Sequence, residues 1–293
     1  MISDDIIITG GRAIARSYAK INMTLDVLGK RSDGSHDVEM IMQTLNLFDL
    51  VLVDRTKYGI SLSTNLRYLP SNDRNIAYKA AKLFFEETGI CGGVKIMIHK
   101  NIPVAAGLAG GSGNGAAVLA AMNMLFNAGL SAEELCRMGA RLGADVPYCI
   151  MGGTQLSKGI GELLTPLPSP EPMLILLVKP FLSVSTADVY REIDSAEITR
   201  RPDTGAMIDA IRKNDIRAIA GNLCNVMESV TEKMYPIIGG IKTKMLKDGA
   251  LGALMSGSGP TVFGIFDDYA KAYKSAESFS YQFKDTFIAR TYN

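Results

Sequence analysis

Five glycines within nine residues are the feature of this sequence that most restricts how the chain can fold. They lie in the segment PVAAGLAGGSGNGAA at residues 103–117. Each glycine costs about 0.5–1 kcal/mol relative to alanine in regular structure, because it loses more backbone freedom on folding. A chain keeps so many of them where φ must be positive or where another group approaches the backbone closely. The segment therefore forms either an awkward turn or a cradle for a ligand.

The segments on either side place this glycine run between a strand and a helix. Residues 94–99 (VKIMIH) alternate as a strand does, and residues 116–126 (AAVLAAMNMLF) have the length and alanine content of a helix. A loop that opens a helix in this way presents backbone N–H groups and the helix dipole to an anion. We expect Ser112 and Asn114 to cap the helix or to contact a phosphate or a magnesium ion. On spacing alone, a tight connection without a ligand stays the alternative.

Three well-known glycine motifs do not fit this segment. The chain contains no GxxxxGK followed by Ser or Thr, which excludes a P-loop of that type. The dinucleotide pattern GxGxxG is absent from the segment. A hydrolase elbow, GxSxG, fails because Asn114 stands where its last glycine belongs.

The rest of the chain indicates a mixture of strands and helices. Residues 19–27 (AKINMTLDV) alternate strictly, which predicts a half-buried strand with Lys20 and Asn22 on a polar second face. Further strands are predicted at 40–53, at 173–178 and after the glycine turn near 257. Predicted helices are one capped by Asn72 or Asp73 and ending at Thr88, one capped by Ser131 and Glu134, one after STADVY at 185–190, two stretches between 204 and 248, and one from Asp268.

Composition excludes several classes of protein. The chain has 293 residues and a formal net charge of +1, which argues against an extended surface for nucleic acid or an anionic membrane. No apolar run is long enough for a membrane span, and acids stand where a secretory signal would be basic. The four cysteines are scattered without a CxxC pair, which is typical of a reducing compartment. We expect a cytoplasmic protein with no nucleic-acid or membrane partner, and both monomer and homodimer stay open.

Five segments, in order along the chain, resemble the motifs of the GHMP kinases. They are AKIN at 19–22 with DGSH at 33–36, the glycine run, GADVP at 143–147, STADVY at 185–190 and MSGSGPTVF at 255–263. A proline-rich segment at 160–170 marks the expected domain boundary. The resemblance implies a two-lobed α+β fold, with an N-terminal ATP-binding domain at 1–162 and a ferredoxin-like C-terminal domain at 163–293.

The resemblance also implies an activity. This is ATP-dependent phosphorylation of a small-molecule substrate at an alcohol group, with ATP and Mg²⁺ as cofactors. Because DGSH stands beside AKIN, the implied acceptor is the 2-hydroxyl of a cytidyl-linked methylerythritol, in non-mevalonate isoprenoid precursor biosynthesis. One alternative is a kinase of the same family that acts on another small alcohol. A second is a paralogue that binds nucleotide without turnover, although the presence of both Lys20 and Asp145 argues against it.

Individual residues take roles from the same resemblance. Asp145 would accept the hydroxyl proton as general base, and Lys20 would orient Asp145 and stabilise the attacking oxygen. The ATP phosphates would be held by Pro103, Val104, Ala105, Ala106, Gly107, Leu108, Ala109, Gly110, Gly111, Ser112 and Gly113. The acceptor would be bound by Asn22, Ser35, His36, Thr186, Tyr190, Gly257 and Ser258, with His36 and Tyr190 at the cytosine. The metal ligands stay unknown.

Four positions depart from the family pattern. Ala109 replaces a glycine, Gly113 a serine and Gly115 an alanine. The loss of one charge-assisted hydrogen bond at Gly113 is worth about 1.5–3 kcal/mol, so these changes are expected to weaken ATP binding or turnover. Ser35 replaces a tyrosine, which removes one aromatic wall of the cytosine site and about 1–3 kcal/mol of stacking.

Overall fold

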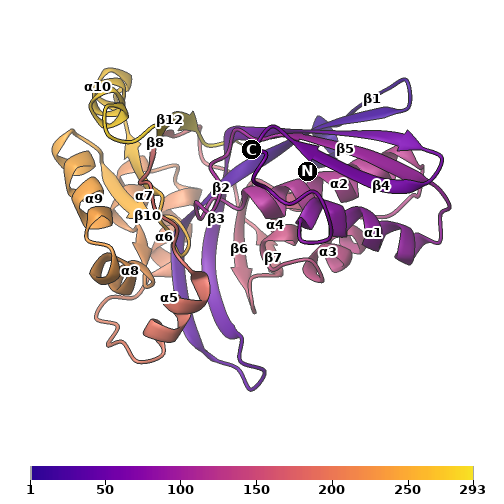
Figure 1. Cartoon of the computed structure of the whole chain (residues 1–293). Helices are drawn as coiled ribbons and strands as arrows, with labels where there is room; N and C mark the ends of the chain where they lie inside the picture. Colours follow the sequence, from indigo (N-terminus) through magenta and orange to yellow (C-terminus); the bar gives the residue numbers. More distant parts are fainter. Residues whose placement is uncertain (1, 293) are drawn as a thin grey trace. The chain divides into compact units, whose positions relative to one another are not determined.

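The computed structural model describes residues 2–292 and has the mixed α+β architecture that the sequence predicts (Figure 1). Contacts divide the chain into two compact units, which are described separately here. The first unit comprises the residues up to Ala19, Leu47–Val104 and Ala109–Gly152; the second comprises Lys20–Asn46, Ala105–Leu108 and the chain from Gly153 onward. Both units are therefore discontinuous in sequence, and the single boundary between 162 and 163 stays a prediction.

The first unit packs four helices on a sheet. Its strands are β1 (Ile7–Thr9), the start of β2 (Arg12–Lys30), the end of β3 (His36–Thr56), β4 (Gly59–Thr64) and β5 (Gly93–His99). Its helices are α1 (Ile76–Thr88), α2 (Gly110–Leu125), α3 (Ala132–Ala140) and α4 (Asp145–Met151), preceded by a 3₁₀ turn at Ile2–Asp5. β5 pairs antiparallel with β3 and parallel with β4. The helices lie along one face of these strands, and the core between them contains Val51, Ile96, Phe84 and Leu119 (Figure 1).

The second unit contains a separate four-stranded antiparallel sheet. Its strand order is β10 (Gly252–Met255), β11 (Val262–Phe266), β8 (Leu174–Lys179), β12 (Asp285–Arg290). The other strands of this unit are the later part of β2 with β9 (Cys224–Asn225), and the early part of β3 with β6 (Thr154–Lys158) and β7 (Leu163–Pro166). Its helices are α5 (Thr186–Ile193), α6 (Thr204–Arg212), α7 (Ile216–Gly221), α8 (Glu228–Met234), α9 (Ile237–Lys247) and α10 (Tyr269–Ser280).

The strand predicted at 19–27 is buried on both faces, and the prediction of a half-buried strand was wrong. Its polar residues Asn22 and Thr24 are fully buried, because segments distant in sequence cover them. Thr24 is paired with Cys224 of β9, and the guanidinium of Arg201 donates to Asp26 at 2.5 Å. The alternation correctly identified the strand and its two faces, but it did not show that the polar face would also be covered.

Several helix boundaries differ from those predicted. α1 begins at Ile76, because the side chain of Asn75, and not of Asn72 or Asp73, accepts the backbone N–H of Ala77 at 3.0 Å. The predicted capping box of Ser131 and Glu134 is confirmed. The region between 204 and 248 contains four helices and the short strand β9 where two helical stretches were expected. Among the described residues, none of the helices combines the length and apolar character needed to cross a bilayer.

Candidate functional site

The glycine run forms a tight loop whose end is already helical. α2 begins at Gly110, six residues earlier than the helix predicted at 116–126. The backbone reaches this start through positive φ values at Ala105 (51°), Gly107 (73°) and Ala109 (55°). A non-glycine residue in this region costs about 1–2 kcal/mol, so Ala105 and Ala109 hold strained backbone at the loop. Ala109 takes the N-cap position without a side-chain hydrogen bond, which leaves the first N–H groups of α2 for another acceptor.

Two departures from the family pattern are explained by close neighbours in the first unit. A Cβ atom at Gly113 would lie 2.6 Å from Oγ of Ser17. A Cβ atom at Gly115 would lie 2.5 Å from Cγ2 of Ile76. Both separations are below any that real side chains show, so glycine is required at these positions while Ser17 and Ile76 keep their places.

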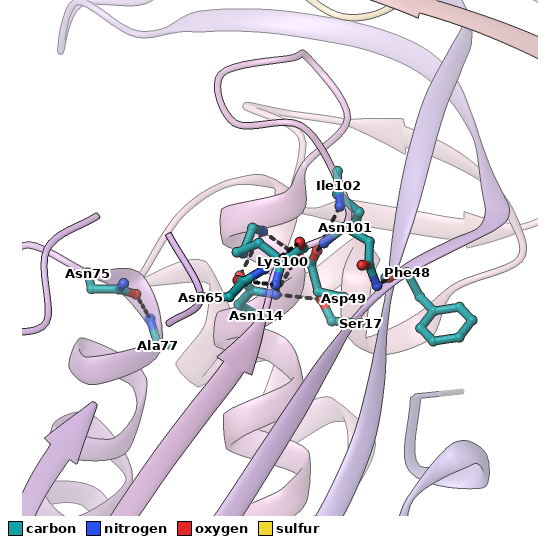
Figure 2. A network of polar contacts seen from close by, with 10 residues as sticks. All are labelled: Ser17, Phe48, Asp49, Asn65, Asn75, Ala77, Lys100, Asn101, Ile102 and Asn114. Carbon is teal, nitrogen blue, oxygen red and sulfur yellow. Dashed lines mark hydrogen bonds and ion pairs between the residues drawn. The ribbon is translucent and has the colours of Figure 1, made fainter. Parts of the chain in front are cut away.

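Asn114 does not cap the helix, which was one of the two roles expected of it. Its side chain is buried and lies in a polar network with Ser17, Asp49 and Lys100 (Figure 2). The physical reason is the position of Asn114 one turn into α2, on the side of the helix that faces β3 and β5. Sequence reasoning missed Asp49 and Lys100; the signals were one acid inside the apolar run at 40–53 and a lysine directly after the strand that ends at His99.

In the second unit, the loop contacts the second glycine turn. Gly107 has no room for a side chain, because a Cβ atom there would overlap the carbonyl oxygen of Ser256 and lie 3.0 Å from that of Gly259. The hydroxyl of Ser256 donates to the carbonyl oxygen of Gly107 at 3.0 Å. These contacts bring together two segments that are far apart in sequence, since Ser256 and Gly107 are separated by 149 positions.

Two buried side chains brace this turn. Nδ2 of Asn225 donates to the carbonyl oxygens of Met255 (2.9 Å) and Gly257 (2.8 Å). The carboxylate of Glu228 accepts the N–H of Met255 at 2.9 Å and pairs with Lys242. Burial raises the pKa of Glu228, while the charge of Lys242 acts in the opposite direction. Neither Asn225 nor Glu228 was predicted as a site residue, because local sequence around them carries no motif.

Lys20 and Asn22 lie next to both glycine segments. The backbone N–H of Lys20 donates to the carbonyl oxygen of Leu108 at 3.2 Å, and its Nζ donates to Oδ1 of Asn22 at 2.6 Å. A Cβ atom at Gly257 would lie 3.6 Å from Oδ1 of Asn22. Lys20 is 4 % exposed, so its ammonium is held almost out of water. A buried ammonium in this position is a strong local source of positive charge.

One face of α5 joins the second glycine turn to an aromatic pair. Thr186 shares a hydrogen bond of 2.8 Å with Ser258. Four residues later, the ring of Tyr190 stacks on His36 with centroids 4.4 Å apart and 16° between the planes. Another four residues later, Asp194 accepts from His36 Nε2 at 2.7 Å and from Lys30 Nζ at 2.6 Å. Residues spaced by four lie on one helix face, so Thr186, Tyr190 and the C-cap residue Asp194 lie along the same face of α5.

The carboxylate of Asp194 is a strong acceptor. Its hydrogen bonds from Lys30, and then from His36, hold its pKa below the usual value. Because the Nε2 atom of His36 faces this carboxylate, the ring is held in one orientation against Tyr190. Ser35, by contrast, turns away: its hydroxyl donates to Asp33 at 2.5 Å within the exposed turn that precedes β3. Asp194 and Lys30 are therefore additional residues of this group that the sequence did not indicate.

Asp145 lies in the first unit and Lys20 in the second. Asp145 is the first residue of α4, and the residue is partly exposed. A carboxylate at this position interacts favourably with the positive end of the helix dipole. The pairing of Asp145 with Lys20 stays a prediction.

No group of three or more His, Cys, Asp or Glu side chains is arranged to hold a metal ion within residues 2–292. Magnesium in nucleotide sites is commonly held by one or two carboxylates, by water and by the phosphates themselves. A site for a magnesium–nucleotide complex therefore needs no such group of side chains.

Two family models match the chain. Residues 75–153 match the GHMP kinases N terminal domain, and residues 207–285 match the GHMP kinases C terminal domain. A 4-diphosphocytidyl-2-C-methyl-D-erythritol kinase of Clostridium novyi (strain NT) is 50% identical over 276 residues, which cover 94% of this chain and 99% of the relative. The enzyme of the same name from Alkaliphilus metalliredigens (strain QYMF) is 48% identical over 95% of this chain and 96% of its own length.

Solved structures have the same fold. A crystal structure of 4-(cytidine 5'-diphospho)-2C-methyl-D-erythritol kinase matches with a TM-score of 0.83 and 29% identity, over 96% of this chain and 99% of that one. A homoserine kinase from Cytophaga hutchinsonii matches with a TM-score of 0.76, over 98% of this chain and 96% of that one. Its identity of 19% supports the fold alone.

Proposed function

The chain belongs to the GHMP kinases, and from that premise we propose that it transfers the γ-phosphoryl group of ATP to the 2-hydroxyl of 4-diphosphocytidyl-2-C-methyl-D-erythritol. One observation carries the assignment of this acceptor. The face of α5 that contacts the second glycine turn through Thr186 also carries Tyr190, which stacks on His36. An acceptor with a phosphorylated chain at one end and a base at the other needs both features on one continuous surface.

Phosphoryl transfer depends mainly on positioning the reactants and on stabilising negative charge. Backbone N–H groups of the loop can do both for the ATP phosphates. The N–H groups at the start of α2 point along the helix axis, where a phosphate of ATP is favoured. Positive φ values at Ala105, Gly107 and Ala109 give the segment directly before this helix the conformation of a tight turn. We assign residues 103–113 to the ATP phosphates on this basis. Mg²⁺ would enter with ATP and neutralise charge on the phosphate oxygens, and Asp145 is the carboxylate that we assign to its neighbourhood.

Lys20 and Asp145 are the proposed catalytic residues. Asp145 would remove the proton of the acceptor hydroxyl as the oxygen attacks the γ-phosphorus atom. The buried ammonium of Lys20 would stabilise the negative charge that develops on this oxygen. Its hydrogen bonds to Asn22 and, through the backbone, to Leu108 hold it beside the loop.

The cytosine would stack on the outer face of Tyr190. A base between His36 and Tyr190 would need about 7–8 Å between the rings, twice a van der Waals separation, and the rings are only 4.4 Å apart. His36 therefore supports the tyrosine from behind and does not itself contact the base. This arrangement replaces the aromatic wall that Ser35 does not provide.

A coupled assay of ADP release tests the proposal. With Mg-ATP and the cytidyl substrate we expect turnover by the unaltered protein and a loss of about 10²–10⁴-fold in kcat for Asp145→Asn, since general-base catalysis contributes that much. Lys20→Met should also lose kcat, with ATP binding retained. Asp209→Asn, which alters an exposed carboxylate paired with Arg212 on α6, is the control and should behave like the unaltered protein.

Two outcomes would redirect the assignment. ATP binding without turnover of the cytidyl substrate, but with turnover of another alcohol, would change the acceptor and keep the family chemistry. ATP binding without turnover of any alcohol would support a nucleotide-binding paralogue. Because the reaction consumes ATP, activity would also support the cytoplasmic location that we predict.

A further inference from the structure

Asp49, in the second half of β3, contacts the chain on both sides of the glycine loop (Figure 2). Its Oδ1 atom accepts the backbone N–H groups of Asn101 (2.7 Å) and Ile102 (2.8 Å), which directly precede the loop. Its Oδ2 atom accepts from Nδ2 of Asn114 at 2.9 Å, one turn into the helix that follows the loop. The same oxygen is paired with Nζ of Lys100.

Lys100 and Asn114 close this network. Nζ of Lys100 also donates to Oδ1 of Asn114 at 3.0 Å, and Nδ2 of Asn114 donates to Oγ of Ser17 at 3.1 Å. A Cβ atom at Gly110 would lie 3.1 Å from Nζ of Lys100, so a glycine at the start of α2 leaves room for the ammonium. The side chain of Asp49 is 0 % exposed and that of Lys100 is 5 % exposed.

Stability alone does not account for this arrangement. Removing two charges from water is costly, and apolar residues of similar volume often replace a buried ion pair without loss of stability. An apolar group at position 49 could not accept the N–H groups of Asn101 and Ile102, however. The carboxylate therefore fixes the distance between Asn101 and Ile102, which follow β5, and Asn114 in the first turns of α2.

We propose that Asp49 is a positioning residue for ATP, acting through the two flanks of the glycine loop. This inference rests on the proposed assignment of the loop to the ATP phosphates. Asp49 contacts neither the nucleotide nor the acceptor; it holds Ile102 and Asn114 at one separation, which sets the direction of the N–H groups at residues 110–112. When the carboxylate is removed, the loop must be ordered by ATP itself, and affinity for ATP falls. Affinity for the acceptor is unchanged.

Three variants test the inference. Asp49→Ala removes all four bonds and leaves Lys100 charged and buried. Asp49→Asn retains an oxygen for the two backbone N–H groups but turns an NH₂ group toward Lys100. The double variant Asp49→Asn with Lys100→Met removes that conflict, because the amide of Asn114 can rotate and accept from the new NH₂ group. Asp54→Asn is the matched control, since Asp54 is on the same strand but is bonded to Arg12, with Nε to Oδ1 at 2.6 Å.

The measurements are the Kd of Mg-ATP by calorimetric titration without acceptor, the KM of each substrate, and Tm. For Asp49→Ala we expect a Kd and a KM for ATP raised about tenfold or more, because hydrogen bonds to a charged group are lost, with the acceptor KM within about twofold. The double variant should recover most of the lost ATP affinity. Hydrogen exchange at 101–113 should accelerate in Asp49→Ala and return toward normal in the double variant.

Unaltered protein that binds no ATP would defeat the proposed function itself. If the unaltered protein binds ATP and the folded fraction of each Asp49 variant binds it equally well, the inference about Asp49 is overturned while the proposed function stands. An equal rise in the KM of both substrates would also overturn it, because that result indicates a general loss of structure. If Asp49→Ala does not fold, Asp49→Asn takes its place: it should bind ATP more weakly than the unaltered protein, and the double variant should restore the affinity.

Discussion

Oγ of Ser17 lies 2.6 Å from the point that a Cβ atom at Gly113 would occupy. Two positions that are almost a hundred residues apart in sequence therefore share one side-chain volume, and the hydroxyl comes from the strand instead of the loop. Ser17 is fully buried, and its hydroxyl oxygen accepts a hydrogen bond from Nδ2 of Asn114.

Gly113→Ser should be destabilising on its own and tolerated with Ser17→Ala. We expect a loss of about 1–3 kcal/mol in the free energy of unfolding for the single change, because the core is overpacked. The double variant should lose less than the sum of the two single changes. Chemical denaturation measures all three, and Gly111→Ala, with its nearest neighbour 4.0 Å away, is the control. Additive losses would show that the two positions do not compete for space.

Gly107→Ala should damage the protein more than an alanine at another positive-φ glycine. Strain at a positive φ costs about 1–2 kcal/mol, and at Gly107 the added methyl group also overlaps the carbonyl oxygen of Ser256. Gly10→Ala is the matched control, because Gly10 has a φ of 53° and open space around it. We expect a larger fall in Tm for Gly107→Ala than for Gly10→Ala, and weaker ATP binding for Gly107→Ala only. Equal effects of the two changes would mean that backbone strain alone is responsible.

Tyr190→Ala should impair binding of the acceptor while leaving ATP binding intact. Loss of a base stack is worth about 1–3 kcal/mol, or about ten- to a hundredfold in the acceptor KM. Tyr190→Phe retains the ring and should stay within about threefold, so steady-state kinetics with both variants separate stacking from the hydroxyl group. An unchanged acceptor KM for Tyr190→Ala would remove Tyr190 from the cytosine site.

Asp194 should make the protein more sensitive to acid. Its pKa is held below the usual 3.8 by Lys30 and His36, so the unfolded chain takes up its proton at a higher pH than the folded protein does. The stabilisation is therefore present above this value and is lost as the pH falls through the folded-state pKa. We expect the unaltered protein to lose stability more steeply than Asp194→Asn on acidification from pH 5 to pH 3, a window about the usual carboxyl pKa. Urea denaturation at each pH measures this, with Asp188→Asn on the same helix as control; parallel curves for the unaltered protein and Asp194→Asn would contradict it.

Local pattern was sufficient to predict the elements that carry the site. Alternation identified the strand at 19–27, and the glycine run between strand and helix indicated the loop that we assign to the ATP phosphates, because these signals depend on near neighbours in sequence. The capping box at Ser131 is of the same kind. Ordered motifs then indicated the family, which the two family models confirm.

Only the tertiary structure decided which residues support that loop. Asp49, Lys100 and Asn114 meet because β3, the end of β5 and the start of α2 come together in space. In the same way, Asn225 and Glu228 brace the second glycine turn, and Asn225 is 30 positions from its partner Met255. A buried polar group must find its hydrogen-bond partner wherever the fold brings one, and that choice depends on contacts over long sequence distances. The residue types and motifs of the site are therefore properties of the sequence, and the network that holds the loop in shape is a property of the packing.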